Sequence, residues 1–527
     1  MFDLQNFLDA LPLVFNVNCL FWLVVGVTVG VGVGALPGLT AVTGVALMLP
    51  LTFQMEVASA LGLLIGLYKG AIFGSSISAI SFATPGAPEA AVIVDDGYRL
   101  TRAGKGKKAI LMALYSSVTG DLASDILVIL IAPVLAVVAL QFGPSERFWI
   151  MMMAIILIGA LSGRHFAKAL ISAGIGMFIA TIGTDPIGAV PRNTFGIWWL
   201  RDGIDLIPLV IGIFALGRML EEMAVILSRN ERVSVTFASI RAAAAIKGEG
   251  LKLREYLSSW KVMTIGIVLG TLIGMLPGLG ATAAAFIMFG IAMKMTGGRQ
   301  DDASALTRIA AAEAGNSATV GPTLVPLLVF GIPGSAVAAL IGGALMLHGA
   351  TPSPRMFELH GEIIYALFVI LILGNFVNLG IGRFFALIYA RLGMFPREIL
   401  IPLVIVLAVV GTYAYMGNPY HVVLMLVFGL LGFAMRVLGI PEGPLVITFM
   451  ITPMAEGAIR RALLISRGDW LEALFKSPLA IGASLAIVVL VAAMRFARSK
   501  EGRAASGPQS RTADPENPAT VSGAERT

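Results

Sequence analysis

Apolar residues run along this chain in long blocks, separated by short stretches of glycine, proline and charge. The blocks 109–141, 363–390 and 477–496 contain few charges and approach or exceed the roughly 20 residues that a helix needs to cross a bilayer. Several other blocks are too short, or too interrupted by Pro-Gly, to cross alone. The pattern predicts an all-α polytopic membrane protein with about 10–12 transmembrane helices and additional re-entrant or broken helices.

Two sequence blocks recur in the same order in the two halves of the chain. Ala35-Leu-Pro-Gly-Leu39 returns as Met275-Leu-Pro-Gly-Leu279, with an offset of 277 − 37 = 240. Ala83-Thr-Pro-Gly86 returns as Gly331-Ile-Pro-Gly334, with an offset of 333 − 85 = 248. Ordered repetition of this kind indicates that the chain consists of two related repeats.

The charges of the loops predict that the two repeats are inverted. Five basic residues lie between 99 and 108, whereas the matching segment 347–362 contains only Arg355. After the first Pro-Gly block the pattern reverses, because 50–57 has no basic residue and three lie between 294 and 308. Basic loops stay in the cytoplasm, so corresponding loops lie on opposite sides. Inverted repeats are typical of secondary transporters.

The same patterns divide the chain into five regions. We expect a first transmembrane repeat over 1–227, a basic cytoplasmic connector over 228–261, a second transmembrane repeat over 262–476, an additional C-terminal transmembrane helix over 477–496 and a disordered polar tail over 497–527.

Four Pro-Gly pairs are expected to break helices inside the bilayer, because proline removes a backbone donor and glycine adopts conformations that other residues avoid. Broken backbone is tolerated at that depth only inside protein or beside a water-filled cavity. A half-helix N-terminus after a break suits an anionic substrate. The predicted substrate-binding breaks are Pro37, Gly38, Pro85, Gly86, Pro277, Gly278, Pro333 and Gly334. The alternative is that Pro-Gly merely kinks a packed helix.

Small polar side chains gather beside these breaks. Their oxygens and amides are suited to a carboxylate or to Na⁺, although a hydroxyl can equally bond back to its own helix. The predicted substrate-binding side chains are Thr40, Ser75, Ser76, Thr282, Asn316 and Ser335. The Gly-x3-Gly ladders that lead to Gly38 and Gly278 are interpreted differently, as faces for close helix packing.

Ionisable residues inside apolar blocks are costly and are functional candidates by default. Lys69 is placed to neutralise a substrate carboxylate. Asp121 and Asp125 lie one helical turn apart and are candidates for binding a coupling ion, with a loop between two shorter helices as the alternative reading. Glu313 and Asn375 are further coupling-ion candidates.

Composition limits the remaining functions. The chain has 527 residues, of which 57% are hydrophobic and 13% charged, and its mean hydropathy is +0.89. One cysteine and four scattered histidines offer no metal centre beyond a Na⁺ site, and no phosphate-binding loop for ATP is present. The net charge of +6 fits basic cytoplasmic loops rather than nucleic-acid binding. The N-terminus has no basic n-region, so no cleaved signal peptide is expected.

The paired Pro-Gly blocks, together with Ala83-Thr-Pro-Gly-Ala-Pro88 and Asp95-Asp-Gly97, resemble the large membrane subunit of tripartite tricarboxylate transporters. The resemblance covers roughly residues 15–465 and departs from the family pattern at Tyr68-Lys69-Gly70. It implies a multi-pass protein of the bacterial inner membrane and no enzymatic activity. The implied partners are a small four-span membrane subunit and a periplasmic solute-binding protein.

By this resemblance the chain imports a small carboxylate such as citrate, driven by a Na⁺ or H⁺ gradient and without a cofactor. Two other functions stay open from the residues alone. One is an intramembrane enzyme acting on a lipid-linked substrate, which would need a tight group of catalytic side chains. The other is a passive anion channel, which would conduct without Na⁺ or H⁺ dependence.

Overall fold

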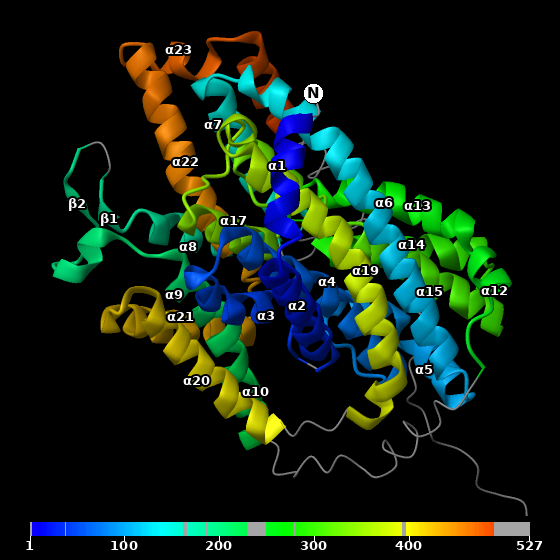
Figure 1. Ribbon diagram of the computed structural model, residues 1–527. Helices are drawn as coiled ribbons and strands as arrows, with labels where there is room; N and C mark the ends of the chain where they lie inside the picture. The colour runs from blue at the N-terminus through cyan, green and yellow to red at the C-terminus, as the bar shows by residue number, and fades with distance from the viewer. Residues whose placement is uncertain are drawn as a thin grey trace, which may run out of the picture.

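The computed structural model describes residues 3–36, 38–161, 166–185, 188–228, 249–278, 280–392 and 397–489. Within these residues the chain is almost entirely helical, and the one strand pair joins β1 (Gly183–Thr184) to β2 (Pro191–Arg192) in an antiparallel ladder. Figure 1 shows the helices gathered into one body, with the strand pair projecting from its side. The prediction of an all-α membrane protein is confirmed.

The elements up to residue 228 follow one another in a fixed order. They are α1 (Leu4–Val14), α2 (Val17–Ala35), α3 (Ala41–Met48), η1 (Leu49–Gln54), α4 (Val57–Phe82), η2 (Pro88–Ile93), α5 (Val94–Arg102), α6 (Gly106–Leu140), α7 (Pro144–Leu161), α8 (Phe166–Ala180), β1, β2, η4 (Trp198–Asp202), α9 (Leu206–Val210), the π-helical η5 (Ile211–Leu216) and α10 (Gly217–Ser228).

The second set of helices begins after residue 249. They are α12 (Leu253–Leu257), α13 (Trp260–Gly274), α14 (Gly280–Met295), α15 (Asp302–Ser317), α16 (Leu324–Phe330), α17 (Ala336–Leu347), α18 (Met356–Leu359), α19 (Gly361–Leu392), α20 (Arg397–Met416), α21 (Pro419–Val437), α22 (Gly443–Ile465), α23 (Trp470–Phe475) and an apolar helix over Pro478–Val489.

Five helices in the described part of the chain are long and apolar enough to cross a membrane. They lie at Val17–Ala35, Val57–Phe82, Gly106–Leu140, Gly361–Ala386 and Pro419–Val437. The helix α6 has 35 residues, a length of about 52 Å, which exceeds the hydrocarbon core of roughly 30 Å. Asp121 and Asp125 lie inside this continuous helix, so the alternative of a loop between two shorter helices is wrong.

The helix α4 lies at the centre of the protein, and α2 packs along it through glycines on both helices. A Cβ atom on Gly30 would lie 2.3 Å from the Leu67 carbonyl oxygen, and one on Gly70 would lie 2.4 Å from that of Val27. These helices therefore touch through their backbones, which small residues alone permit. The interpretation of the first glycine ladder as a packing face is confirmed.

The second ladder packs in the same way. Gly270 on α13 lies against α15, where a Cβ atom would come within 2.4 Å of the Gly315 carbonyl oxygen. In each half, the helix that carries the ladder thus lies against the second α-helix that follows it in the sequence. The contacts between the halves are also reciprocal: α4 packs against α19, and α15 packs against α6.

One end of the bundle collects the basic loops. Lys105 pairs with Asp302, and Lys108 Nζ lies 2.8 Å from Glu255 Oε1 in α12. Nearby, the guanidinium of Arg308 forms a two-pronged ion pair with Asp96, at 2.5 and 2.6 Å. Residues that follow the second break of the first half, at Gly86, therefore contact residues that follow the first break of the second half, at Gly278.

Asp301 starts α15 at this same end. Its carboxylate accepts bonds from the Ser304 backbone N–H and hydroxyl, at 2.8 and 2.9 Å. Both bonds lower the pKa of Asp301, and the bond from the backbone N–H has the larger effect. This carboxylate therefore stays ionised at the end of the helix where negative charge is favourable.

The opposite end of the bundle holds the N-terminal helix and the segment 347–362. The Asp3 backbone N–H donates to the Tyr365 hydroxyl at 2.7 Å, and Ala139 near the end of α6 lines the same cavity as Ser353. Lys105 precedes the start of α6. Residues 105 and 353 consequently lie near opposite ends of this long helix, which runs from α5 at lower right to the top of Figure 1.

The predicted connector, C-terminal helix and tail each lie partly or wholly outside the described residues. The connector over 228–261 is described only at Ser228 and from residue 249, where it contains α12 and the start of α13. The predicted C-terminal helix over 477–496 is described as far as 489, and the predicted disordered tail over 497–527 lies outside the described residues.

The backbone contact between α2 and α4 predicts a position-specific effect of a single methyl group. Gly30→Ala should lower the stability of the purified protein by about 1–3 kcal/mol, because its Cβ has no room beside Leu67. Gly32→Ala is the matched control on the same helix, since a Cβ there meets no atom within 4 Å. Thermal unfolding in detergent measures both variants, and equal melting temperatures would contradict this packing.

Candidate functional site

The first break of each half uses a glycine in the left-handed region. Gly38 has φ +92° and Gly278 has φ +91°, so the chain turns in the same way after α2 and after α13. Residues with a side chain rarely adopt this backbone conformation, which explains why glycine occupies both positions. Pro37 lies outside the described residues, while Pro277 lies in the turn before Gly278.

The second break of each half is buried against the first. A Cβ atom on Gly86 would lie 1.9 Å from the Gly34 carbonyl oxygen, and one on Gly334 would lie 3.3 Å from that of Gly274. The Gly278 N–H also donates to the Gly334 carbonyl at 3.1 Å. The structure thus brings the two breaks of each half together, with Pro85 and Pro333 in the same turns.

The polar side chains beside the breaks have several different partners. Thr40 and Ser335 start α3 and α17 as N-caps, accepting from the Thr43 N–H at 3.4 Å and the Ala338 N–H at 3.1 Å. Ser75 donates back to its own helix at Ile72. Their hydroxyls therefore have local partners in this structure.

Thr282 and Glu89 form a polar contact between the halves. The Thr282 hydroxyl donates to Glu89 Oε2 at 3.4 Å, where η2 packs against α14. Sequence analysis did not single out Glu89, although it is an acidic residue three positions after Gly86. That spacing from a predicted break is the signal that could have found it.

Four of the predicted side chains meet in a group that we call the ionic cluster: Lys69, Asp121, Asp125 and Asn375. Lys69 Nζ lies 2.7 Å from Asp121 Oδ2 and 2.8 Å from Asp125 Oδ2. It also donates to Asn375 Oδ1 at 3.2 Å, and the Asn375 amide donates to Asp125 Oδ2 at 2.6 Å. The cluster joins α4 and α6 of the first half to α19 of the second.

The ionic cluster is buried and carries more negative than positive groups. The exposed fraction of each of its four residues is at most 4%. One ammonium faces two carboxylates, and Asp121 Oδ1 and Asp125 Oδ1 have no hydrogen-bond partner among the described residues. Buried charge without compensation is costly, so a cation or a proton at these free oxygens would stabilise the cluster.

The backbone of the second half closes tightly over this cluster. A Cβ atom on Gly321 would lie 2.3 Å from Asp125 Oδ1, and one on Gly374 would lie 3.0 Å from Lys69 Cδ. Gly321 belongs to the turn between α15 and α16, and α16 leads to the break at Pro333. The turn next to a broken helix therefore rests directly on an aspartate of the cluster.

A second polar group lies between α4 and α15. The Ser76 hydroxyl donates to Glu313 Oε1 at 2.8 Å, and both residues are buried. Glu313 Oε2 and both polar side-chain atoms of Asn316 have no partner within the described part of the chain. These unpaired atoms make Glu313 and Asn316 the second place where the buried interior could bind a polar ligand.

Neither group has the composition of a bound transition-metal centre. No cluster of three or more histidine, cysteine, aspartate or glutamate side chains suited to a metal ion occurs among the described residues. The oxygens of the ionic cluster are of the kind that hard cations prefer.

Buried charged side chains, together with Pro-Gly breaks in a bundle of apolar helices, are typical of membrane transport proteins. The chain belongs to the tripartite tricarboxylate transporter TctA family, which matches residues 20–447. The resemblance to the large subunit of these transporters is thereby confirmed.

Two proteins from Agrobacterium vitis are similar to this chain. The "uncharacterized 52.8 kDa protein in TAR-I ttuC' 3'region" is 29% identical over 487 residues, which cover 91% of this chain and 94% of the relative. The "uncharacterized protein in TAR-II ttuC' 3'region" is 30% identical over 201 residues, which cover 38% of this chain and 83% of the relative. No solved structure matches the chain.

The charge arrangement predicts a specific order of stabilities. Lys69→Met leaves two aspartates buried without their ammonium and should cost about 3–5 kcal/mol. Adding Asp121→Asn to this variant should recover part of the loss, because a single carboxylate then remains. Thermal unfolding in detergent measures the series, and a double variant less stable than Lys69→Met would contradict the predicted charge balance.

Proposed function

We propose that this protein is the translocating subunit of an ion-driven importer of tricarboxylates or related carboxylates. It works with a small four-span membrane subunit and a periplasmic solute-binding protein in the bacterial inner membrane. Family membership supports the transporter class, and the buried ionic cluster carries the proposal of ion coupling.

An inverted arrangement of the two repeats would supply alternating access. Reciprocal packing of α4 on α19 and of α15 on α6 supports a two-fold relation between the halves. The ion pairs of Lys105 with Asp302 and of Lys108 with Glu255 support a shared cytoplasmic end for loops of opposite halves. In such folds, one bundle moves against the other around a site near the midplane.

The carboxylate binds beside the four glycine breaks in this proposal. Gly38 and Gly278 place turning backbone directly before helices, and Gly86 and Gly334 bring the second breaks against them. Backbone N–H groups and small hydroxyls at helix starts are suited to carboxylate oxygens. Ser76 and Asn316 lie next to this region, and the unpaired amide of Asn316 is free to bind the substrate.

Ion coupling follows from the contact between the ionic cluster and the second half. A Na⁺ or a proton binds the free oxygens of Asp121 and Asp125 and offsets their excess negative charge. Lys69 then acts within the ion site, since its ammonium already lies between the two aspartates. Because Gly321 touches Asp125, occupancy of the ion site biases the turn that leads to the break at Pro333.

Transport by the complete three-component system tests this function. Cells without their own importers should accumulate labelled citrate or a dicarboxylate only with the binding protein and an intact Na⁺ or H⁺ gradient. Asp125→Asn should abolish accumulation while exchange of carboxylate across the membrane persists, because it removes an ion ligand. Asp302→Asn is the control, since that aspartate lies at the surface beside Lys105.

Three outcomes would contradict the proposal. Flux only down the carboxylate gradient, indifferent to ions and to the binding protein, would indicate a channel. Chemical conversion of a lipid-linked substrate would indicate an enzyme. Undiminished ion-driven accumulation by Asp125→Asn would remove the ionic cluster from the coupling mechanism.

The inverted arrangement has its own test in cysteine accessibility. Lys105→Cys should react with a membrane-impermeant maleimide only from the cytoplasmic side, and Ser353→Cys only from the outside. The native Cys19 is 1% exposed and contributes little background. Reaction of both positions from the same side would contradict the inversion.

A further inference from the structure

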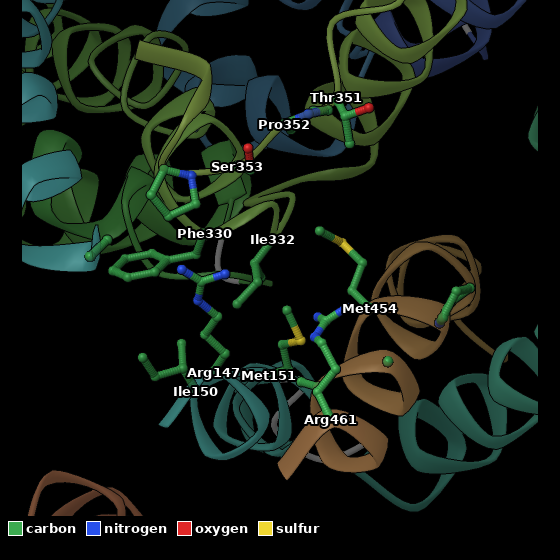
Figure 2. Close-up of a pocket in the computed structure, with 15 residues that line it drawn as sticks. Arg147, Ile150, Met151, Phe330, Ile332, Thr351, Pro352, Ser353, Met454 and Arg461 are labelled. Atoms are coloured by element: carbon green, nitrogen blue, oxygen red, sulfur yellow. The ribbon is translucent and has the colours of Figure 1, made fainter. Parts of the chain in front are cut away.

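A cavity of about 260 Å³ opens at the end of the bundle opposite the basic loops. It is small beside drug-sized ligand pockets, which span about 300–1,000 Å³, and so suits a small molecule. Helices α7 and α22, the segment 351–354 and the residues before the fourth break enclose it (Figure 2).

Two arginines supply the polar chemistry of this cavity. Figure 2 shows Arg147 rising from α7 and Arg461 from α22 toward the space beside Ile332. No aspartate or glutamate lines the cavity. Arg461 and Arg355 both add positive potential at Arg147, and Glu146, which lies outside the cavity lining, partly offsets it.

These two arginines differ from their neighbours in lacking a carboxylate. Arg147 donates through Nε to the Phe142 carbonyl at 3.1 Å, and within the described residues neither it nor Arg461 has an acidic partner. The adjacent Arg460, by contrast, pairs with Asp185 at 2.8 Å and with Glu456 at 2.5 Å. Two guanidinium groups that form no ion pair with a carboxylate at one cavity favour an anion, and their planar geometry matches a carboxylate.

The cavity borders the broken helices. Phe330 and Ile332 line it and directly precede the break at Pro333 and Gly334. Phe330 also stacks on Phe142, with ring centroids 6.1 Å apart, which forms an apolar wall beside Arg147. An anion held here would lie next to the fourth break, which belongs to the proposed substrate site.

We propose that this cavity is an outer carboxylate site, in which Arg147 and Arg461 bind the substrate before it reaches the glycine breaks. The assignment rests on the proposed function for the identity of the substrate and for the direction of transport. A small di- or tricarboxylate fits the volume and the charge of this cavity, and its carbon backbone can pack against the apolar wall.

Protection of a cysteine in the cavity measures binding without transport. The purified subunit carrying Ser353→Cys is labelled with maleimide at constant ionic strength, with citrate or succinate as the probe and chloride as the reference. Carboxylate should slow labelling, and Arg147→Gln or Arg461→Gln should each raise the half-maximal carboxylate concentration about tenfold or more. Arg467→Gln is the control, because Arg467 lies on the same side but outside this cavity.

The same variants are assayed for citrate uptake in the complete system, where KM should rise about tenfold with little change in kcat. Arg147→Lys and Arg461→Lys keep the charge and distinguish lost charge from lost packing. Loss of the melting transition identifies any variant that does not fold. Such a variant is replaced in the test by the corresponding lysine variant. The lysine variant is then expected to bind carboxylate more weakly than the parent.

Equal protection in the parent and in the arginine variants would overturn the proposal. Labelling that ignores carboxylate but falls when phosphatidylglycerol is added to phosphatidylcholine vesicles would also overturn it, in favour of a lipid headgroup. Failure of the proposed function looks different: no carboxylate is accumulated by the parent in uptake assays, whatever the labelling shows.

Discussion

Lys69 poses the central electrostatic constraint of this structure. Its ammonium is buried in α4, the most enclosed of the long helices, and a single buried charge of this kind is unstable unless oppositely charged groups surround it. Asp121 and Asp125 from α6 and Asn375 from α19 meet it. The Lys69 ammonium thereby joins three long helices from both halves of the chain.

The second aspartate makes this group the proposed ion site. One lysine and one aspartate would be neutral, whereas one lysine and two aspartates leave a negative charge that an external cation or proton can balance. The turn at Gly321 lies against Asp125, which is how we propose that the charge state of the cluster acts on the backbone that leads to the fourth break. In the proposed mechanism, ion binding and movement of the broken helix share this one contact.

Close backbone packing makes this burial possible. The glycines of α2 and α4 bring carbonyl oxygens within contact of the facing helix, and the same device recurs between α13 and α15. Gly374 leaves space for the Lys69 side chain where any larger residue would fill it. Small residues in this protein therefore set both the distances between helices and the room for the ionic cluster.

Much of the helical architecture could be predicted from the sequence, because apolar length and Pro-Gly breaks leave direct traces in composition. Lys69, Asp121, Asp125 and Asn375 were recognisable as costly intramembrane residues, but their meeting was not, since no local pattern records a contact between residues 69 and 375. Gly321 and Glu89 were missed for a related reason, because their significance comes from neighbours distant in sequence. Arg147 and Arg461 lie at helix ends, where arginine is ordinary, and only the enclosing cavity distinguishes them.

Cation uptake on substrate binding tests the central claim most directly. The purified protein is mixed with carboxylate, while bound ²²Na⁺ is counted and proton uptake is followed with a pH dye in weak buffer. The account predicts that one of these cations is taken up together with carboxylate by the native protein, and neither by Asp125→Asn, which still binds carboxylate. Equal cation uptake by Asp125→Asn and by the native protein would contradict the ionic cluster as the ion site.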